Sequence, residues 1–175
     1  MTIVPVDSHT RLRPLALGDE PSLARQGDDF DIARWMRDRF PHPYTRESAE
    51  SWVQFNLDVV PVCNFAIEVD GELVGCAGIL LGDDIHRASC EIGYWLGRTH
   101  WGKGTATRVV RALTQHAMDG LRLERVFASV FEGNVASCRV LEKSGFRHEG
   151  VMRRSVLKNG VHLDSHLYAR VVGDP

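Results

Sequence analysis

The sequence lacks a long apolar run, an N-terminal leader pattern and a strong charge of one sign. Its longest uninterrupted apolar stretch is far shorter than the roughly 20 residues that cross a bilayer. Its first eight residues show no basic segment followed by an apolar one, which excludes the pattern of a signal peptide. With 21 Lys and Arg against 23 Asp and Glu, the chain has no electrostatic field that would attract nucleic acid. We therefore expect neither a membrane nor a nucleic acid as partner.

Cysteine is scarce, and no two cysteines have Cys-x-x-Cys spacing. The four are Cys63, Cys76, Cys90 and Cys138. Three fall in strand or helix patterns, which favours reduced, buried thiols in a cytoplasmic enzyme and argues against structural zinc. His162, Asp164 and His166 alternate along one expected strand and so share a face, which permits a metal but fits a half-exposed strand equally well. We expect no metal site.

What is present is an alternation of strand and helix patterns in a chain long enough for one domain with a proper core. Strands are expected over residues 10–15, 64–69, 72–81, 88–96, 126–130, 146–157 and 161–171. Helices are expected from 20 to about 27, over 30–39, from a cap at Thr45 to Asn56, from 105 to Gly120, and from a cap at Asn134 to Ser144. Without repeats or linkers, residues 1–175 are predicted to form a single α/β domain around a mixed sheet, with its core at 9–172.

The most informative segment is residues 91–106, Glu-Ile-Gly-Tyr-Trp-Leu-Gly-Arg-Thr-His-Trp-Gly-Lys-Gly-Thr-Ala. Its pattern predicts a strand that stops at Gly97, a short turn, and a helix opened by Gly102-x-Gly104. Backbone N–H groups at a helix start point outward and attract an anion, most often a phosphate. Glycines there let the backbone approach a pyrophosphate closely. The segment therefore predicts a phosphate-bearing cofactor.

Three kinds of phosphate loop can be compared with this segment. The ATP-binding P-loop needs Ser or Thr directly after Lys103 to ligate magnesium, and this chain has Gly104 there. The dinucleotide fingerprint needs a third small residue three positions after Gly104, where this chain has Thr107 instead. It also needs an acidic residue roughly 20 positions further on, for which Asp119 and Glu124 are available. The third form, Gln/Arg-x-x-Gly-x-Gly/Ala, cradles the pyrophosphate of coenzyme A. Compared with these three forms position by position, the segment favours coenzyme A.

Three blocks of the sequence resemble the GNAT N-acetyltransferase superfamily. The first is Tyr94-Trp-Leu-Gly97 followed by Trp101-Gly-Lys-Gly-Thr-Ala106, which looks like its acetyl-CoA loop. The others are Asn134-Val-Ala-Ser137-Cys-Arg-Val-Leu-Glu-Lys-Ser-Gly145-Phe146 and Pro43-Tyr44-Thr45 leading to Ala49-Glu50-Ser51-Trp52. The blocks cover nearly the whole chain in family order and are similar to the RimJ/RimL-like branch, which acetylates the N-termini of ribosomal proteins. Thr99, three positions before Gly102, stands where the loop form has Gln or Arg, and this difference weakens one side-chain contact to the cofactor.

The resemblance implies a GNAT fold, with a mixed and mostly antiparallel central sheet flanked by helices. It implies direct transfer of an acetyl group from acetyl-CoA to a primary amine, and a homodimer as the assembly. The residues that it assigns to the cofactor are Trp95, Leu96, Gly97, Trp101, Gly102, Lys103, Gly104, Thr105, Ala106, Asn134 and Ser137.

Catalytic roles follow for two side chains and one backbone group. Glu91, on the strand that leads into the loop, is the candidate general base, since apolar neighbours would make its carboxylate a stronger base; its alternative is an ordinary strand carboxylate paired with an arginine. The Leu96 N–H is the candidate oxyanion donor. Ser137 is the candidate acid for the leaving thiolate, although it and Asn134 could simply cap a helix. Tyr168 is the rival acid, with core or wall packing as its alternative.

The acceptor stays open at this level. The branch resemblance implies a protein or peptide N-terminus. The alternatives are a small amine, such as an amino acid or antibiotic, or a non-catalytic acyl-CoA-binding regulator. Trp35, Tyr44 and Trp52 could line an acceptor pocket, as helices before the first hairpin do in the family, but packing in the core is the favoured interpretation.

Overall fold

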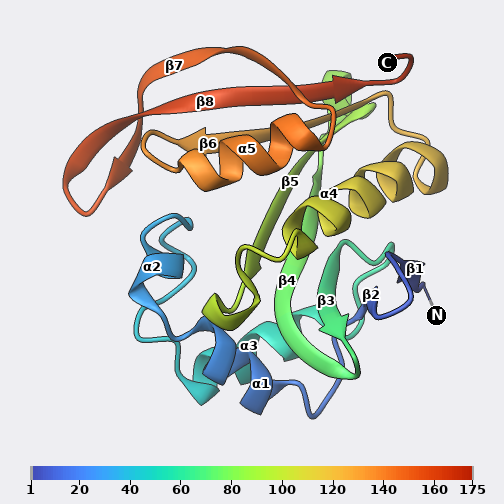
Figure 1. Cartoon of the computed structure of the whole chain (residues 1–175), viewed down its shortest axis with the longest axis vertical. Helices are drawn as coiled ribbons and strands as arrows, with labels where there is room; N and C mark the ends of the chain where they lie inside the picture. Colours follow the sequence, from blue (N-terminus) through green and yellow to red (C-terminus); the bar gives the residue numbers. More distant parts are fainter. Residues whose placement is uncertain (1, 175) are drawn as a thin grey trace. The chain divides into compact units, whose positions relative to one another are not determined.

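The computed structural model describes residues 2–174 (Figure 1). In chain order the strands are β1 (Val4–Pro5), β2 (Thr10–Pro14), β3 (Asn64–Val69), β4 (Glu72–Leu81), β5 (Ser89–Leu96), β6 (Arg125–Phe131), β7 (Arg147–Lys158) and β8 (Val161–Val171). The α-helices are α1 (Glu20–Gly27), α2 (Phe30–Ala33), α3 (Arg46–Asn56), α4 (Thr105–Gln115) and α5 (Val135–Lys143). Short helical turns lie at η1 (Asp84–His86), η2 (Arg98–His100) and η3 (His116–Gly120), the last with π-helical hydrogen bonding.

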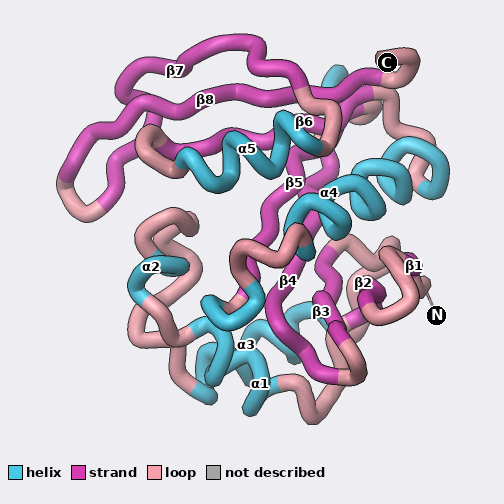
Figure 2. The backbone as a smooth tube through the Cα atoms, in the orientation of Figure 1, coloured by secondary structure: helices cyan, strands magenta, loops and turns pink. Residues whose placement is uncertain are grey.

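The chain divides into two compact units that share strands β4 and β5. The first unit comprises the residues up to Gly78 together with Tyr94–Ala112. The second comprises Ile79–Gly93 and the residues from Leu113 onward. In the described part of the chain the strands pair in the order β1-β2-β3-β4-β5-β6-β8-β7. The β5–β6 pair is parallel, whereas the β1–β2, β2–β3, β3–β4, β6–β8 and β7–β8 pairs are antiparallel. The predicted mixed, mostly antiparallel α/β architecture is confirmed (Figure 2).

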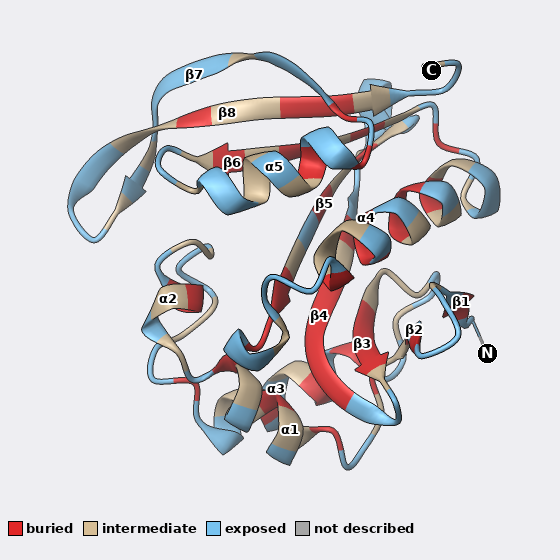
Figure 3. Cartoon of the chain, viewed as in Figure 1, coloured by how far each residue is buried: buried red, intermediate tan, exposed pale blue. Residues whose placement is uncertain are grey.

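The first unit contains a core between its helices and its strands. Buried residues of this core are Leu15, Leu23, Ile32, Tyr44, Ala49, Val53, Ala66, Leu73, Cys76 and Trp95. Strands β3 and β4, which carry Ala66, Leu73 and Cys76, have long red stretches in Figure 3, and Trp95 lies in β5. Tyr44 is buried, and its ring centroid lies 4.7 Å from that of Phe40. Trp52 packs against the same core. Both aromatic residues therefore follow the packing interpretation.

Turn and cap signals in the sequence are confirmed where neighbouring residues set them. The β3–β4 turn at Asp70-Gly71 has φ of 50° and 84°, the left-handed pair that a two-residue hairpin turn needs. The Thr45 hydroxyl accepts a hydrogen bond from the Ser48 N–H at 3.3 Å and so caps α3. At the end of α5, Gly145 has φ of 84°, and the Phe146 N–H donates to the Leu141 carbonyl at 3.0 Å. These bonds form a glycine-terminated helix end.

One helix prediction is wrong in extent, and a second reaches its expected end at Gly120 with a different geometry in its last turn. The helix expected over residues 30–39 ends at Ala33, because the following N–H groups of Trp35 and Met36 bond to carbonyls three residues back and tighten the chain out of α geometry. The helix expected to close at Gly120 changes at Gln115 into a π-helical turn. Gly120 is needed there, since a Cβ atom would lie 2.9 Å from Nδ1 of His116.

Candidate functional site

The end of β5 directs backbone groups of successive residues to opposite edges of the strand. The Gly97 N–H donates to the Val74 carbonyl of β4 at 2.8 Å. Because N–H directions alternate along a strand, the Leu96 N–H is directed away from β4. The close approach of the two strands excludes any side chain at Gly75, where a Cβ atom would lie 2.1 Å from the Trp95 carbonyl oxygen. This geometry is compatible with the oxyanion-donor role predicted for the Leu96 N–H.

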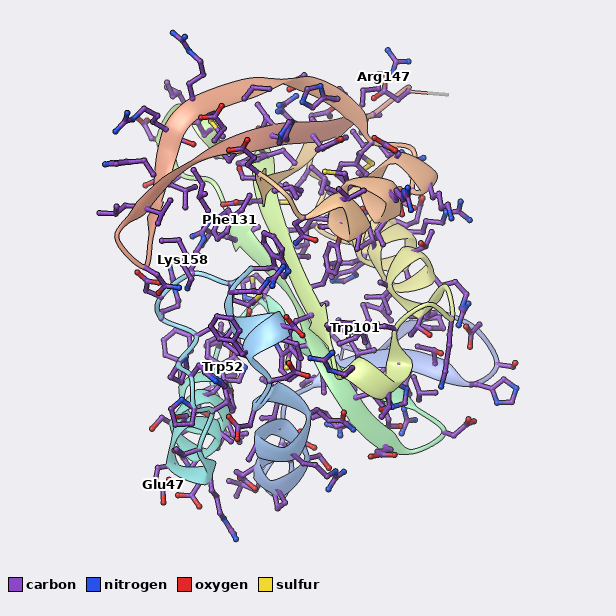
Figure 4. All side chains as sticks on the ribbon, turned by 60° about the vertical axis from the view of Figure 1, so that its left-hand side comes forward. Glu47, Trp52, Trp101, Phe131, Arg147 and Lys158 are labelled. Carbon is purple, nitrogen blue, oxygen red and sulfur yellow. The ribbon has the colours of Figure 1, made fainter. Side chains whose placement is uncertain are left out.

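The turn after β5 is held by an aromatic side chain. Trp101 is 42% exposed, and its indole N–H donates to the Leu96 carbonyl at 2.7 Å, spanning the four residues between them. The guanidinium of Arg98 lies 5.2 Å from the Trp101 ring centroid. Figure 4 shows Trp101 in the loop before α4. The indole therefore fixes the shape of the turn that leads into the predicted phosphate loop.

The predicted phosphate loop has the backbone that its sequence implies. Gly102 and Gly104 have φ of 72° and 75°, a left-handed conformation that favours glycine, and residues 101–104 are exposed. Helix α4 begins at Thr105, and its first turn presents N–H groups toward the loop. Arg108 braces this start, donating to the Lys103 carbonyl at 3.1 Å and to the Thr105 hydroxyl at 3.3 Å.

Charge around the loop suits an anionic ligand. Lys103 lies within it, and Arg98 and Arg108 contact it from either end. Arg108 is also paired with Asp7, whose carboxylate lies 2.7 Å from its Nε. Two left-handed glycines, an outward helix start and the Lys103 ammonium form a cradle suited to a diphosphate, whereas the charge of Arg98 is balanced by Asp29 and Asp31 and that of Arg108 by Asp7. The residues predicted from Trp101 to Ala106 therefore fit coenzyme A.

In the second unit, Glu91 lies in β5 opposite Phe127 of β6, with which β5 pairs over Ser89–Glu91. The neighbours of Glu91 in the chain, Cys90 and Ile92, are buried. Glu91 itself is half-buried and lies on the opposite face of the strand from them. Its role as base stays a prediction.

Asn134 and Ser137 begin helix α5 of the second unit. Oδ1 of Asn134 accepts a hydrogen bond from the Ser137 N–H at 3.2 Å, so the capping interpretation is confirmed for both. The cap uses only the side-chain oxygen of Asn134 and only the backbone of Ser137. The carboxamide nitrogen and the Ser137 hydroxyl are not part of the cap, so the cofactor and acid roles stay predictions.

Tyr168 is engaged by α5. Its buried hydroxyl donates to Oε1 of Glu142 at 3.1 Å. Burial, with further contributions from Cys138 and Glu142, raises the pKa of Tyr168 well above the ordinary tyrosine value. A buried phenol that already donates to a carboxylate favours a structural role over that of an acid for a leaving group.

Two features, a metal-binding cluster and a membrane-spanning helix, are absent from residues 2–174, the part of the chain that the structure describes. No group of three or more His, Cys, Asp and Glu side chains there is arranged to hold a metal ion. His166 pairs instead with His148, Nδ1 to Nε2 at 3.2 Å, and Asp164 accepts from the Arg154 N–H at 2.7 Å. The same part of the chain contains no helix that is both long and apolar enough to span a membrane.

One cluster escaped the sequence reasoning. Arg98 pairs with Asp29 and Asp31, which lie 69 and 67 residues earlier in the chain. No spacing rule connects residues so far apart. The local signal that was available is Asp29 at the start of α2, where its side chain accepts from the Asp31 N–H as a helix cap.

Comparison with known proteins identifies the family. Residues 9–147 match the model described as acetyltransferase (GNAT) domain. A probable N-acetyltransferase of Bacillus subtilis (strain 168), YjcK, is 45% identical in an alignment of 168 residues, and the match covers 90% of this chain and 91% of the relative. The ribosomal-protein-serine acetyltransferase of Escherichia coli (strain K12) is 30% identical over 108 residues, 62% of this chain and 60% of the relative.

Two further similarities concern the acceptor class and the fold. The L-amino acid N-acetyltransferase AaaT of Escherichia coli (strain K12) is 26% identical over 132 residues, 75% of this chain and 79% of the relative. The solved structure of RimL, a ribosomal L7/L12 α-N-protein acetyltransferase in complex with coenzyme A, matches with a TM-score of 0.87. That match covers 99% of this chain and 100% of the other at 23% identity, and it bears on the fold alone.

Proposed function

The chain belongs to the GNAT acetyltransferase family and is an N-acetyltransferase that uses acetyl-CoA, and from that premise we propose that it acetylates the primary amine of a protein or peptide N-terminus. The observation that carries the cofactor part is the exposed loop at the start of α4, with Gly102 and Gly104 both left-handed. The acceptor part is supported by similarity to the ribosomal-protein-serine acetyltransferase.

Binding of the cofactor is assigned to two sets of residues. The backbone from Gly102 to Ala106, with the side chains of Trp101 and Lys103, would hold the diphosphate. Trp95, Leu96 and Gly97 would offer strand backbone to the peptide-like arm. Asn134 and Ser137 would contact the same arm nearer its sulfur. When bound, acetyl-CoA supplies an acetyl group activated as a thioester.

Each catalytic residue has one task. The Leu96 N–H donates to the acetyl carbonyl oxygen, on which negative charge develops. Glu91 accepts the proton of the attacking amine, directly or through water. Ser137 donates its hydroxyl proton to the leaving thiolate and takes up a replacement proton from solvent; a weak donor suffices because a thiol has a pKa near 8.5. The donation from Tyr168 to Glu142 supports Ser137 over Tyr168 as this acid.

A second acceptor class has an observation in its favour. AaaT, a relative over 75% of this chain, is named for L-amino acids. A small amine therefore remains the alternative acceptor. We also propose that residues 1–175 act as one N-acetyltransferase domain in the cytoplasm, and the homodimer implied by the resemblance stays a prediction.

The test measures thiol release from acetyl-CoA with a panel of peptides that carry different N-terminal residues, beside a panel of free amino acids. We expect turnover with a subset of the peptides and acetylation at their α-amine by mass spectrometry. Turnover with free amino acids alone would move the acceptor to the small-amine class. Tight coenzyme A binding without turnover of any peptide or amino acid would overturn both acceptor assignments.

A further inference from the structure

Arg98 contacts two separate segments of the first unit. On one side its guanidinium lies over the ring of Trp101, at the entrance of the phosphate loop. On the other side it meets the carboxylate of Asp29 with two N–H groups, Nε at 2.7 Å and Nη2 at 2.8 Å, and it also donates to Asp31. A guanidinium fork on one carboxylate fixes orientation as well as distance. Arg98 therefore links the loop to the start of α2.

Asp29 has a second task that makes this link consequential. Its Oδ1 accepts from the Asp31 N–H at 2.8 Å and caps α2, a helix of only four residues. The neighbouring Arg98 holds the pKa of the Asp29 carboxyl below its usual value. A helix this short gains little from its own hydrogen bonds. Its position thus depends on a cap whose partner, Arg98, belongs to the turn before the phosphate loop.

Two closer contacts run beside the ion pair. A Cβ atom built on Gly97 would lie 1.9 Å from Oε1 of Gln26, so the Gln26 side chain rests against the Gly97 backbone. A Cβ atom on Gly27 would lie 3.4 Å from the Trp95 ring. The segment before α2 therefore follows the end of β5 at successive points, and Arg98 extends this contact into the turn.

We infer that Arg98 is a positioning residue that transmits occupancy of the phosphate loop to residues 28–36. The inference rests on the proposed function, in which the loop holds coenzyme A. A ligand that orders the loop also orders the Arg98 side chain, which lowers the entropic cost of holding Asp29 and Asp31 in place. An acceptor that contacts α2 would then bind more tightly after the cofactor than before it.

The test is hydrogen–deuterium exchange of the full chain, followed by mass spectrometry, with and without coenzyme A. In the unmodified protein, coenzyme A should slow exchange in residues 97–106 and, by roughly fivefold or more, in residues 28–36. Arg98→Gln should keep the first effect and lose the second. Arg98→Lys should restore only part of it, because a single ammonium cannot make the fork.

Two further variants separate the ion pair from the helix cap and from general charge effects. Asp29→Asn keeps a good capping residue but removes the charge, so it should reproduce Arg98→Gln with α2 intact. Arg46→Gln breaks an exposed pair with Glu50 on α3 and should leave both responses unchanged. If Arg98→Gln does not fold, Asp29→Asn decides the result.

The outcomes separate the two claims. No slowing of exchange in residues 97–106 of the unmodified protein would overturn the coenzyme A site and the inference together. Slowing confined to residues 97–106 would overturn the inference alone. The same holds if the response of residues 28–36 persists in both Arg98→Gln and Asp29→Asn.

Discussion

The indole N–H of Trp101 donates to the carbonyl oxygen of Leu96, the residue whose own N–H is the proposed oxyanion donor. One side chain of the cofactor loop thus holds the Leu96–Gly97 peptide group, which directly follows the N–H proposed as oxyanion donor. The bond closes a turn that both the phosphate loop and the strand end share. Loss of this bond should therefore weaken cofactor binding more than it lowers the stability of the fold.

Trp101→Phe keeps an aromatic ring but removes the donor. A neutral hydrogen bond contributes about 1 kcal/mol, so we expect the Kd for coenzyme A, measured by calorimetry, to rise roughly fivefold with little change in Tm. The matched control is Trp52→Phe, because Trp52 packs against the core of the first unit. This variant should leave the Kd unchanged. Equal Kd values for Trp101→Phe and the unmodified chain would remove the indole from the loop's function.

Gly104→Ala tests the left-handed loop. A left-handed alanine costs about 1–2 kcal/mol, and a Cβ atom at Gly104 would also lie 3.2 Å from Nη1 of Arg108. Gly160→Ala is the matched control, because Gly160 has φ of 77° and open space around it in the β7–β8 turn. Both variants should lose similar stability in denaturant titrations. Only Gly104→Ala should lose coenzyme A affinity.

The contrast between Gly160 and Arg98 shows what the sequence could predict. The Asn159-Gly160 turn, the Asn134 cap and the Gly145 helix end are each decided by residues within a few positions, so their patterns sufficed. Figure 4 shows Arg147 and Lys158 at the two ends of the β7 strand that this turn closes. The pairing of Arg98 with Asp29 depends on how the chain folds back on itself, and no local pattern encodes it.

The predicted end of α2 is wrong for a related reason. Apolar residues at helical spacing continue to Met36, yet the helix ends at Ala33. Met36 packs against the core from a tighter turn, so its side chain is partly buried although its backbone is not α-helical. Periodicity reports which residues are buried, but it does not report which backbone conformation buries them.

Glu91→Gln tests the proposed base. The amide cannot accept the ammonium proton, so kcat/KM for an accepted peptide should fall roughly 100-fold at neutral pH. The fall should shrink as pH rises toward the pKa of the peptide amine, because the free amine then needs no base. Coenzyme A affinity should stay unchanged. A variant with the full rate across the pH range would return Glu91 to an ordinary strand carboxylate.

Ser137→Ala tests the proposed acid against its rival. The variant keeps the Ser137 backbone N–H and therefore the Asn134 cap. We expect thiol release to slow at least roughly tenfold, whereas Tyr168→Phe should slow it much less. The two variants are compared by single-turnover kinetics with one peptide, so that product release does not hide the chemical step. The opposite ranking would make Tyr168 the acid.

Tyr168→Phe also predicts a pH dependence of stability. The folded-state pKa of Tyr168 is raised above the ordinary value of 10.0. Below that value both the folded and unfolded forms keep the phenol neutral, so stability does not vary with pH on this account. As pH rises above 10.0 the unfolded chain ionises first, and the folded state loses stability until its own raised pKa is passed. The unmodified chain should therefore lose stability more steeply in alkali than Tyr168→Phe.

Urea midpoints at neutral pH and above pH 10.0 measure this difference. At neutral pH, Tyr168→Phe should be less stable by about 1 kcal/mol, because the bond to Glu142 is lost. In alkali the gap between the two chains should narrow. Tyr44→Phe is the matched control, since burial raises the pKa of Tyr44 as well, so it should flatten the alkaline slope without touching Glu142. A gap that stays constant with pH would mean that the Tyr168 phenol ionises as readily in the folded chain as in the unfolded one.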